Sequence, residues 1–172
     1  MRNRQNWSKQ CEEELNLQIN REYHASYVYH AITKFFGRGD IGLSKLEDFF
    51  KKQSIEERDH ADKLMDYQNM RGGKVLLKDI NPVIIDNDIN TNYVLDLFHL
   101  ALKLERDINS NLLELHKIAD TNNDPQFTDY LEGEFLKEQV ESIYEFSKII
   151  SQLEKIGNDN GSIWIFIDKY FS

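Results

Sequence analysis

The sequence contains few residues that interrupt helices and almost none that crosslink a chain. Only 2 prolines and 8 glycines occur among its 172 residues, which favours long helices over a turn-rich β fold. Its one cysteine, Cys11, cannot form an internal disulfide. We therefore expect Cys11 to be a free thiol at the surface of a protein from a reducing compartment.

Long apolar segments are also missing. The longest wholly apolar run covers residues 163–167, which is far too short to cross a bilayer, so no membrane association is expected. The basic residues near the start, Arg2 and Arg4, are not followed by an apolar stretch. No secretory signal is indicated, and we expect a cytoplasmic protein.

The charge balance is acidic, with 30 Asp and Glu residues against 21 Lys and Arg residues and a net charge of −9. Such a chain repels phosphate groups and attracts cations, so a nucleic-acid partner is not expected. A hydrophobic content of 40% is typical of a globular protein. Residues 1–172 are enough to form one domain around a single core.

Helix start and stop signals divide the chain into four long helical segments and one short segment. Asp124, an N-cap residue followed by Pro125, begins the fourth segment, and Gly157 ends it. The second segment begins at Ser44, with Glu47 three residues later, which is the pattern of a capping box. We predict helices over residues 8–36, 44–72, 91–122, 124–157 and 162–171.

The connections between these segments determine how the helices run. Short turns join the first helix to the second and the third to the fourth, so each pair should be antiparallel. Residues 73–90 form a longer connection of about 18 residues, which can reach roughly 59 Å when extended. A helix of about 28 residues is roughly 42 Å long, so this connection can cross the whole bundle.

The predicted fold is therefore an all-α, up-down-down-up four-helix bundle with one long crossover and a short C-terminal fifth helix. The second and third helices run parallel in this arrangement. Within the crossover, the alternation of Val75, Leu77 and Asp79 indicates an extended strand along the surface.

Each long helix has an inward-facing series of residues at three- and four-residue spacing, with a polar residue near its middle. Glu22 lies about as many residues before the first turn as Glu57 lies after it. Glu105 and Gln139 are placed in the same way around the second turn. Antiparallel packing would bring such residues to one height. The predicted interior layer consists of Glu22, Tyr29, Glu57, His60, Glu105 and Gln139.

Buried carboxylates without a partner cost several kcal/mol each. No lysine or arginine lies on these helix faces at that height, so a pair of metal cations is expected. Carboxylates with one imidazole suit iron or manganese, and Glu57 and His60 lie one turn apart on one helix face. Two members of the layer have alternative roles: Gln139 as a core amide bonded to a neighbour, and Tyr29 as ordinary core packing.

Five segments of the chain resemble motifs of eukaryotic ferritins. They are residues 18–29, 56–61, 68–73, 112–117 and 138–140. The resemblance extends from about residue 5 to residue 169. It implies a ferritin-like bundle that forms a homo-oligomeric shell of 24 subunits. It also implies that Fe(II) and dioxygen are the partners, and that ferric oxyhydroxide is stored inside the shell.

Residue by residue, the resemblance implies a ferroxidase centre of the heavy-chain type. Glu22, Glu57 and His60 correspond to ligands of a first iron, and Glu57 also bridges to a second iron. Glu105 corresponds to a ligand of the second iron. The light-chain members of the family lack this set, so its presence implies catalysis.

The second iron position looks poor in ligands. Gln139 and Tyr29 correspond to residues beside it, and the role of the tyrosine stays open between a hydrogen-bond donor and an electron donor. Bacterial di-iron relatives carry a second Glu-x-x-His on the fourth helix, where this chain has Leu136 and Gln139. We therefore expect two irons per subunit that bind transiently as substrate.

Two further groups are implied by the resemblance alone. Asp129 and Glu132 correspond to acidic residues that line the three-fold channel through which iron enters the shell. Glu56, Asp59 and Asp62 correspond to the acidic inner surface on which the mineral nucleates.

Four other protein classes fit less well. A di-iron oxygenase normally keeps two full Glu-x-x-His sets, and a DNA-protecting mini-ferritin does not suit the acidic balance or the fifth helix. A non-catalytic ferritin subunit would lack Glu57 or His60. A helical signalling bundle would not tolerate a layer of acids in its core.

Overall fold

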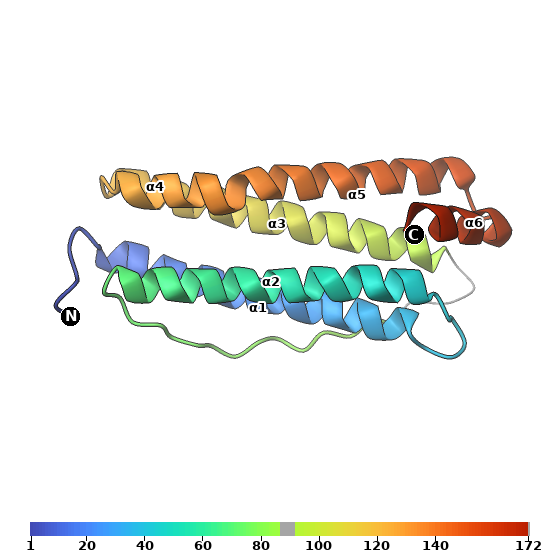
Figure 1. Ribbon diagram of the computed structural model, residues 1–172, viewed down its shortest axis with the longest axis horizontal. Helices are drawn as coiled ribbons and strands as arrows, with labels where there is room; N and C mark the ends of the chain where they lie inside the picture. Colours follow the sequence, from blue (N-terminus) through green and yellow to red (C-terminus); the bar gives the residue numbers. More distant parts are fainter. Residues whose placement is uncertain (87–91, 172) are drawn as a thin grey trace.

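The computed structural model describes residues 1–86 and 92–171, and within them it contains helices but no strand. Figure 1 shows the helices as long rods lying side by side. In chain order they are α1 (Lys9–Phe36), α2 (Ser44–Met70), α3 (Tyr93–Thr121), α4 (Pro125–Leu131), the π-helical turn η1 (Glu132–Leu136), α5 (Lys137–Ile156) and α6 (Asn160–Tyr170).

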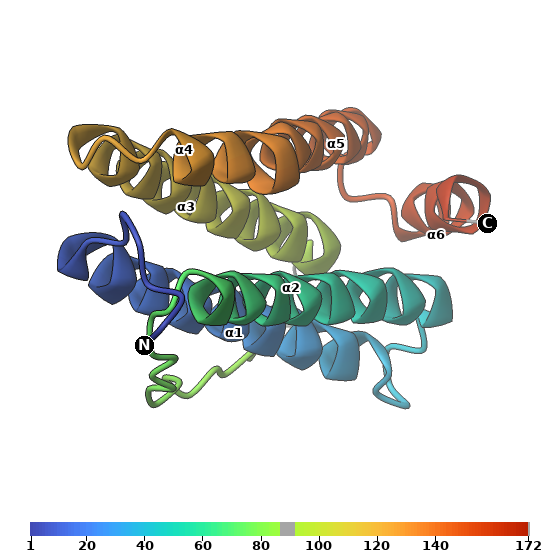
Figure 2. The same cartoon turned by 60° about the vertical axis from the view of Figure 1, so that its left-hand side comes forward.

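The topology confirms the predicted bundle. α1 and α2 form one antiparallel pair, and α3 forms another with the rod made of α4, η1 and α5 (Figure 2). The chain leaves α2 at one end of the bundle and enters α3 at the other, so these two helices run parallel (Figure 1). No helix in the described residues is both long enough and apolar enough to cross a membrane.

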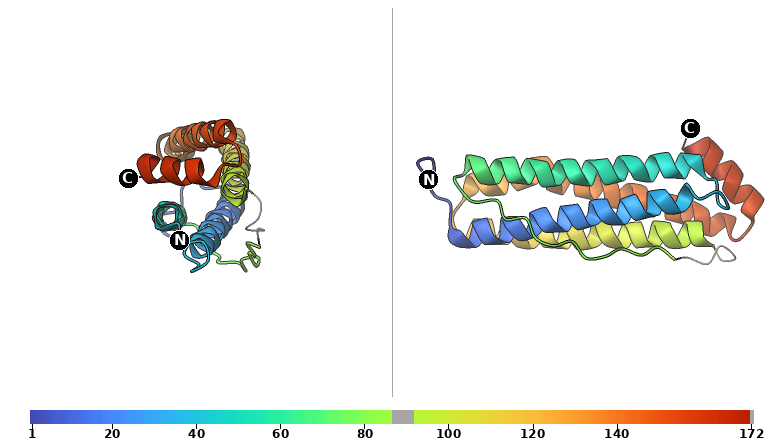
Figure 3. Two further views of the ribbon diagram at one scale, coloured as in Figure 1. Left: turned by 90° about the vertical axis from the view of Figure 1, so that its right-hand side faces the viewer. Right: turned by 90° about the horizontal axis from the view of Figure 1, so that it is seen from below.

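The crossover lies extended along α1 (Figure 3), but the expected strand around Val75 does not form. The backbone of the crossover bonds to side chains of α1 instead of to another strand. Asn16 donates to the carbonyl of Lys74 (2.9 Å) and accepts from the amide of Leu76 (2.9 Å). Asn20 donates to the carbonyl of Asp79 (3.1 Å). Asparagine amides on one helix therefore satisfy several backbone polar groups of this segment.

The helix starts at Ser8, Ser44 and Asp124 agree with the sequence, but one predicted capping pattern does not form. The side chain of Asp124 caps α4, as predicted, and the side chain of Ser8 caps α1 at the predicted start of that helix. The predicted capping box is wrong, because Ser44 is the first helical residue of α2 and makes no cap bond. α3 begins after Asn92, whose side chain caps it; the predicted start near Thr91 lies outside the described residues.

The fourth long helix contains a π-helical turn that sequence periodicity did not predict. Phe127, Leu131, Phe135 and Gln139 are all buried at four-residue intervals. Four residues overshoot an α-helical turn of 3.6, and the wider π turn takes up the excess. Phe135 is therefore 2% exposed, while its neighbour Leu136 is only half-buried.

The core consists of two apolar clusters with the polar layer between them. One cluster lies at the end where α6 crosses the bundle and includes Phe50, Phe98 and Phe146. The other lies towards the chain start and includes Trp7 and Cys11. The prediction that Cys11 lies at the surface is wrong: its side chain is fully buried, and burial raises the pKa of its thiol.

Candidate metal centre

Three of the predicted residues meet inside the bundle. Glu22, Glu57 and His60 each offer one ligand atom, and these atoms all lie within 4.8 Å of one another. The side chains are almost sealed from solvent, with Glu22 0%, Glu57 5% and His60 8% exposed. Nδ1 of His60 lies 3.3 Å from a carboxylate oxygen of Glu57. This is the one such group of acidic, histidine and cysteine side chains in the part of the chain that the structure describes.

Close packing of α1 against α2 brings these residues together. Glu57 and His60 lie one turn apart on the inner face of α2, opposite Glu22 on α1. Directly beside them, the small side chains of Ser26 and Ser54 allow the two helices to approach. Each serine hydroxyl donates to the backbone carbonyl of the other residue, at 2.6 and 2.8 Å. This reciprocal pair sets the height of one helix against the other.

The electrostatics of this group favour a bound cation. Burial, followed by the charge of Glu57, holds the pKa of Glu22 well above the usual range. Burial and the charge of Glu105 do the same for the pKa of Glu57. Among the described residues, no lysine or arginine forms an ion pair with either carboxylate. Without a metal ion, protons must therefore compensate these negative charges.

The other three predicted residues form a second connected group. Glu105, on α3, accepts hydrogen bonds from the hydroxyl of Tyr29 on α1 and from the amide of Gln139 on α5. The Gln139 amide also donates to the backbone carbonyl of Glu105 at 2.9 Å. Burial raises the pKa of Glu105, and the two donors oppose that shift. In this structure Gln139 is a core amide bonded to a neighbour. Tyr29 makes a hydrogen bond in addition to packing in the core.

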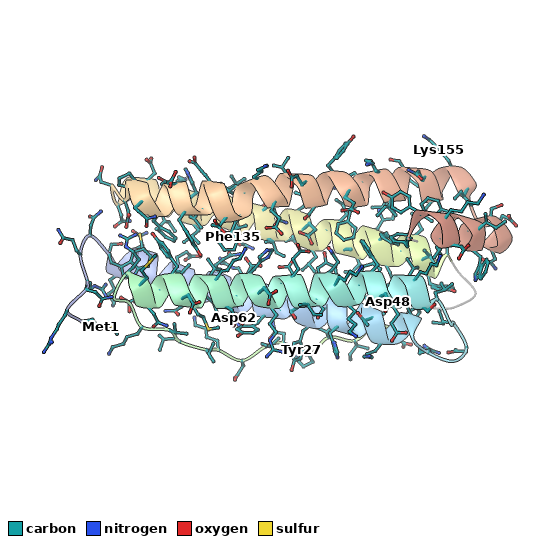
Figure 4. The ribbon with its side chains drawn as sticks, viewed as in Figure 1. Met1, Tyr27, Asp48, Asp62, Phe135 and Lys155 are labelled. Carbon is teal, nitrogen blue, oxygen red and sulfur yellow. The ribbon has the colours of Figure 1, made fainter. Side chains whose placement is uncertain are left out.

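Glu138 belongs to the surroundings of the centre, although sequence reasoning missed it. Its carboxylate lies 3.3 Å from Nε2 of His60, opposite the side that faces Glu57. It also bonds to Glu56, and burial together with this neighbour raises the pKa of Glu56 to about 7. The ring of Phe135 packs against His60 from the same rod, with 5.5 Å between ring centroids, and Figure 4 labels it between that rod and α2.

The acidic residues assigned to the inner surface are all exposed and do not form one tight group in the chain. Glu56, Asp59, His60 and Glu138 line a surface depression between α2 and α5. Asp62 lies apart from this depression and accepts a hydrogen bond from Tyr23 on α1 (3.3 Å).

The residues assigned to the three-fold channel are exposed near the start of the fourth rod. Asp129 lies in α4 and Glu132 in η1. The Glu132 carboxylate lies 2.7 Å from Nε2 of His116 on α3. A channel on a three-fold axis needs three copies of the chain, so this one chain presents a single acidic edge.

Comparison with known proteins agrees with this architecture. Residues 12–156 match the model of the ferritin-like domain. Over 164 residues, which is 95% of the chain, it is 47% identical to a chloroplastic ferritin of Malus baccata var. xiaojinensis. Over the same share it is 46% identical to ferritin-4, chloroplastic, of Arabidopsis thaliana and 44% identical to a chloroplastic ferritin of Phaseolus vulgaris. The chain spans 65%, 63% and 64% of the length of these three relatives.

These relatives overturn one prediction. A cytoplasmic location was expected because no signal is visible in the sequence, yet the relatives are named as chloroplastic proteins. The match over most of the chain, the bundle with one long crossover and the buried acid–imidazole group all agree with one another. The chain belongs to the ferritin family.

Proposed function

We propose that this chain is a catalytic ferritin subunit of the heavy-chain type, which oxidises Fe(II) with dioxygen and stores the product. Ferritin relatives support the iron-storage role. The observation that carries the catalytic part is the buried group of Glu22, Glu57 and His60, which has no cationic side chain among the described residues to balance it. Iron is both the compensating charge and the substrate.

In this proposal the first iron binds to Glu22, Glu57 and His60, and Glu57 bridges to the second. Glu105 binds the second iron after its carboxylate has given up one of its hydrogen-bond donors. Gln139 and Tyr29 already hold Glu105 by hydrogen bonds, so the second position competes with existing contacts. Two irons per subunit therefore bind briefly and leave, as a substrate should.

The proposed reaction balances as two Fe(II), one dioxygen and four waters giving two FeO(OH), one hydrogen peroxide and four protons. Each iron loses one electron, and dioxygen gains both. Holding two irons side by side lets one dioxygen take both electrons in a single encounter. Iron binding first displaces the protons that the raised pKa values of Glu22 and Glu57 favour in the metal-free site.

We also propose assembly into a 24-subunit shell. Exposed apolar side chains on α6, Trp164 at 59% and Ile165 at 53% exposed, suit burial against neighbouring subunits. In the shell, Asp129 and Glu132 would line the three-fold channel, and Glu56, Asp59 and Asp62 would face the mineral. By the names of its relatives, the protein acts in a plastid.

Replacing two ligands at once tests the proposed reaction. Glu57→Ala with His60→Ala should leave the shell assembled but abolish rapid Fe(II) oxidation, followed by absorbance in aerobic stopped-flow experiments. Asp48→Ala with Lys51→Ala is a matched control, because both residues are exposed on the same helix. Size-exclusion chromatography verifies assembly of both variants. An unchanged initial rate in the ligand variant would refute the catalytic assignment.

A further inference from the structure

Gln18 is a buried side chain that contacts the centre without being a candidate ligand. It lies on α1 one turn before Glu22 and is 0% exposed. Its amide nitrogen donates to Oε1 of Glu22 at 2.7 Å. The other oxygen of Glu22, Oε2, is buried and has no hydrogen-bond partner among the residues that the structure describes. One oxygen of this carboxylate is therefore held by the protein, and the other is left free.

The orientation of the Gln18 amide is itself fixed by its surroundings. Its oxygen accepts a hydrogen bond from the guanidinium of Arg21 at 3.3 Å, and Arg21 is held by an ion pair with Glu14 at 3.0 Å. A guanidinium only donates, so it requires the amide oxygen on its side. The amide NH₂ must then face Glu22. A chain of contacts from the half-buried edge of α1 thus ends on a ligand of the proposed centre.

We propose that Gln18 is a positioning residue for iron: it holds Oε1 of Glu22 and so presents Oε2 alone to the metal. The inference rests on the proposed function. A carboxylate that binds through one oxygen leaves an additional coordination position open for water or dioxygen, whereas a carboxylate that binds through both oxygens closes it. Partners that orient metal ligands in this way commonly change metal affinity by about 10- to 100-fold when removed.

A purely structural role for a buried amide is the competing explanation, and α1 offers a matched control for it. Asn16 is also a buried amide on this helix, at 2% exposed. It donates to the backbone carbonyls of Glu12 (3.0 Å) and Lys74 (2.9 Å) and makes no contact with the centre. Asn16→Leu should therefore reproduce any general cost of losing a buried amide on α1.

Cobalt(II) binding separates the positioning role from the structural one, because the intensity of its visible absorption falls as its coordination number rises. Gln18→Met removes the hydrogen bond at similar volume, and Gln18→Glu replaces the donor with a second carboxylate. We expect Gln18→Met to weaken Co(II) binding about 10-fold and to lower the absorption per bound ion. Gln18→Glu should also change the spectrum, and Asn16→Leu should bind Co(II) like the unmodified protein.

The outcomes are distinct. An unchanged Co(II) spectrum and affinity in assembled Gln18→Met shells would overturn the positioning role. If that variant does not assemble, the same null result in Gln18→Glu would overturn it. Equal changes in Gln18→Met and Asn16→Leu would also refute it, because they would reflect general loss of packing. The proposed function fails separately, if the unmodified protein binds no Co(II) or if Glu57→Ala with His60→Ala keeps its oxidation rate.

Discussion

The hydroxyl of Tyr29 on α1 donates a hydrogen bond to the carboxylate of Glu105 on α3, so the two helix pairs are joined by a polar contact in the middle of the bundle. Both side chains are buried, at 0% and 2% exposed. Burial, and next the charge of Glu105, hold the pKa of Tyr29 well above its usual range. Tyr29 therefore keeps its proton and remains a donor to Glu105 in the metal-free protein.

Tyr29→Phe should destabilise the metal-free protein by about 1–3 kcal/mol, because a buried carboxylate loses one of its donors. Iron oxidation should continue, since Gln139 still bonds to Glu105. Guanidinium unfolding of the metal-free protein measures the loss. The control is Tyr144→Phe, which alters an exposed tyrosine on α5; equal stabilities of the two variants would contradict the prediction.

The stability of the metal-free protein should depend on pH in a direction opposite to that of ordinary paired carboxylates. The pKa values of Glu22, Glu57 and Glu105 are raised in the folded protein. Protonation of these groups therefore stabilises the fold fully below about pH 4.5, their unfolded pKa. As pH rises from there through the folded pKa of each group, that group's contribution is lost by about 1.4 kcal/mol per pH unit.

Thermal unfolding in the presence of a chelator, measured between pH 5 and pH 8, checks this dependence. The midpoint should fall with rising pH without metal. Saturating zinc(II) should reverse the slope, because metal binding displaces protons. A variant with glutamine at all three positions should lose both effects. A midpoint that rises with pH in the chelated protein would contradict the prediction.

The ion pair of Arg71 and Asp124 should contribute strongly to stability at the end of the bundle where α2 ends and α4 begins. Its atoms lie 2.6 Å apart, and the Asp124 side chain is 2% exposed. Arg71 also packs over the Trp7 ring, at 4.6 Å from its centroid. Asp124→Asn keeps a capping side chain but leaves a partly buried guanidinium without its charge partner, at a cost of about 1.5–3 kcal/mol.

A double-mutant cycle measures this pair. Arg71→Met, Asp124→Asn and the double variant are compared by guanidinium unfolding, and the double variant should lose less stability than the sum of the single variants. Additive losses would show that the two side chains act independently.

Two glycines should respond to alanine in opposite directions. Gly72 has a φ of +74°, and a Cβ there would lie 2.8 Å from the backbone nitrogen of Arg4. Gly133 lies in η1, and a Cβ there would meet nothing within 4 Å. Gly72→Ala should destabilise the protein by about 1–2 kcal/mol or more, whereas Gly133→Ala should stabilise it by about 0.5–1 kcal/mol. Denaturation of both variants checks the signs, and the same sign for both would be the contrary result.

The sequence predicted the bundle and the polar layer because both follow from regular spacing. Ser8, Asp124 and Pro125 marked real helix starts, and counting from the turns placed Glu22 and Glu57 at one height. The capping box predicted at Ser44 was wrong, because the sequence pattern does not show whether the serine precedes the helix or is its first residue. Here Gly42, with a φ of +62°, and Leu43 turn the chain into α2.

Features that depend on contacts between helices were not predictable in this way. Glu138 lies in a charged, partly exposed run of α5, and only its 3.3 Å approach to His60 shows its place. Gln18 did leave a signal, because it lies four residues before Glu22 on the same helix face. The prediction of a cytoplasmic location was wrong for a different reason, because the compartment of a protein is not determined by its fold.

The π turn in the fourth rod keeps its two halves on a shared inner face. Over the stretch from Phe127 to Gln139, an uninterrupted α-helix would leave its two ends roughly 120° apart in azimuth. The wider π turn removes most of this difference, so both side chains point into the core. Deleting Gly133 would therefore let the rod rewind as an α-helix while Asp129 and Gln139 keep nearly the same azimuths. The extra residue is absorbed within one turn, and the inner face of the rod continues through it.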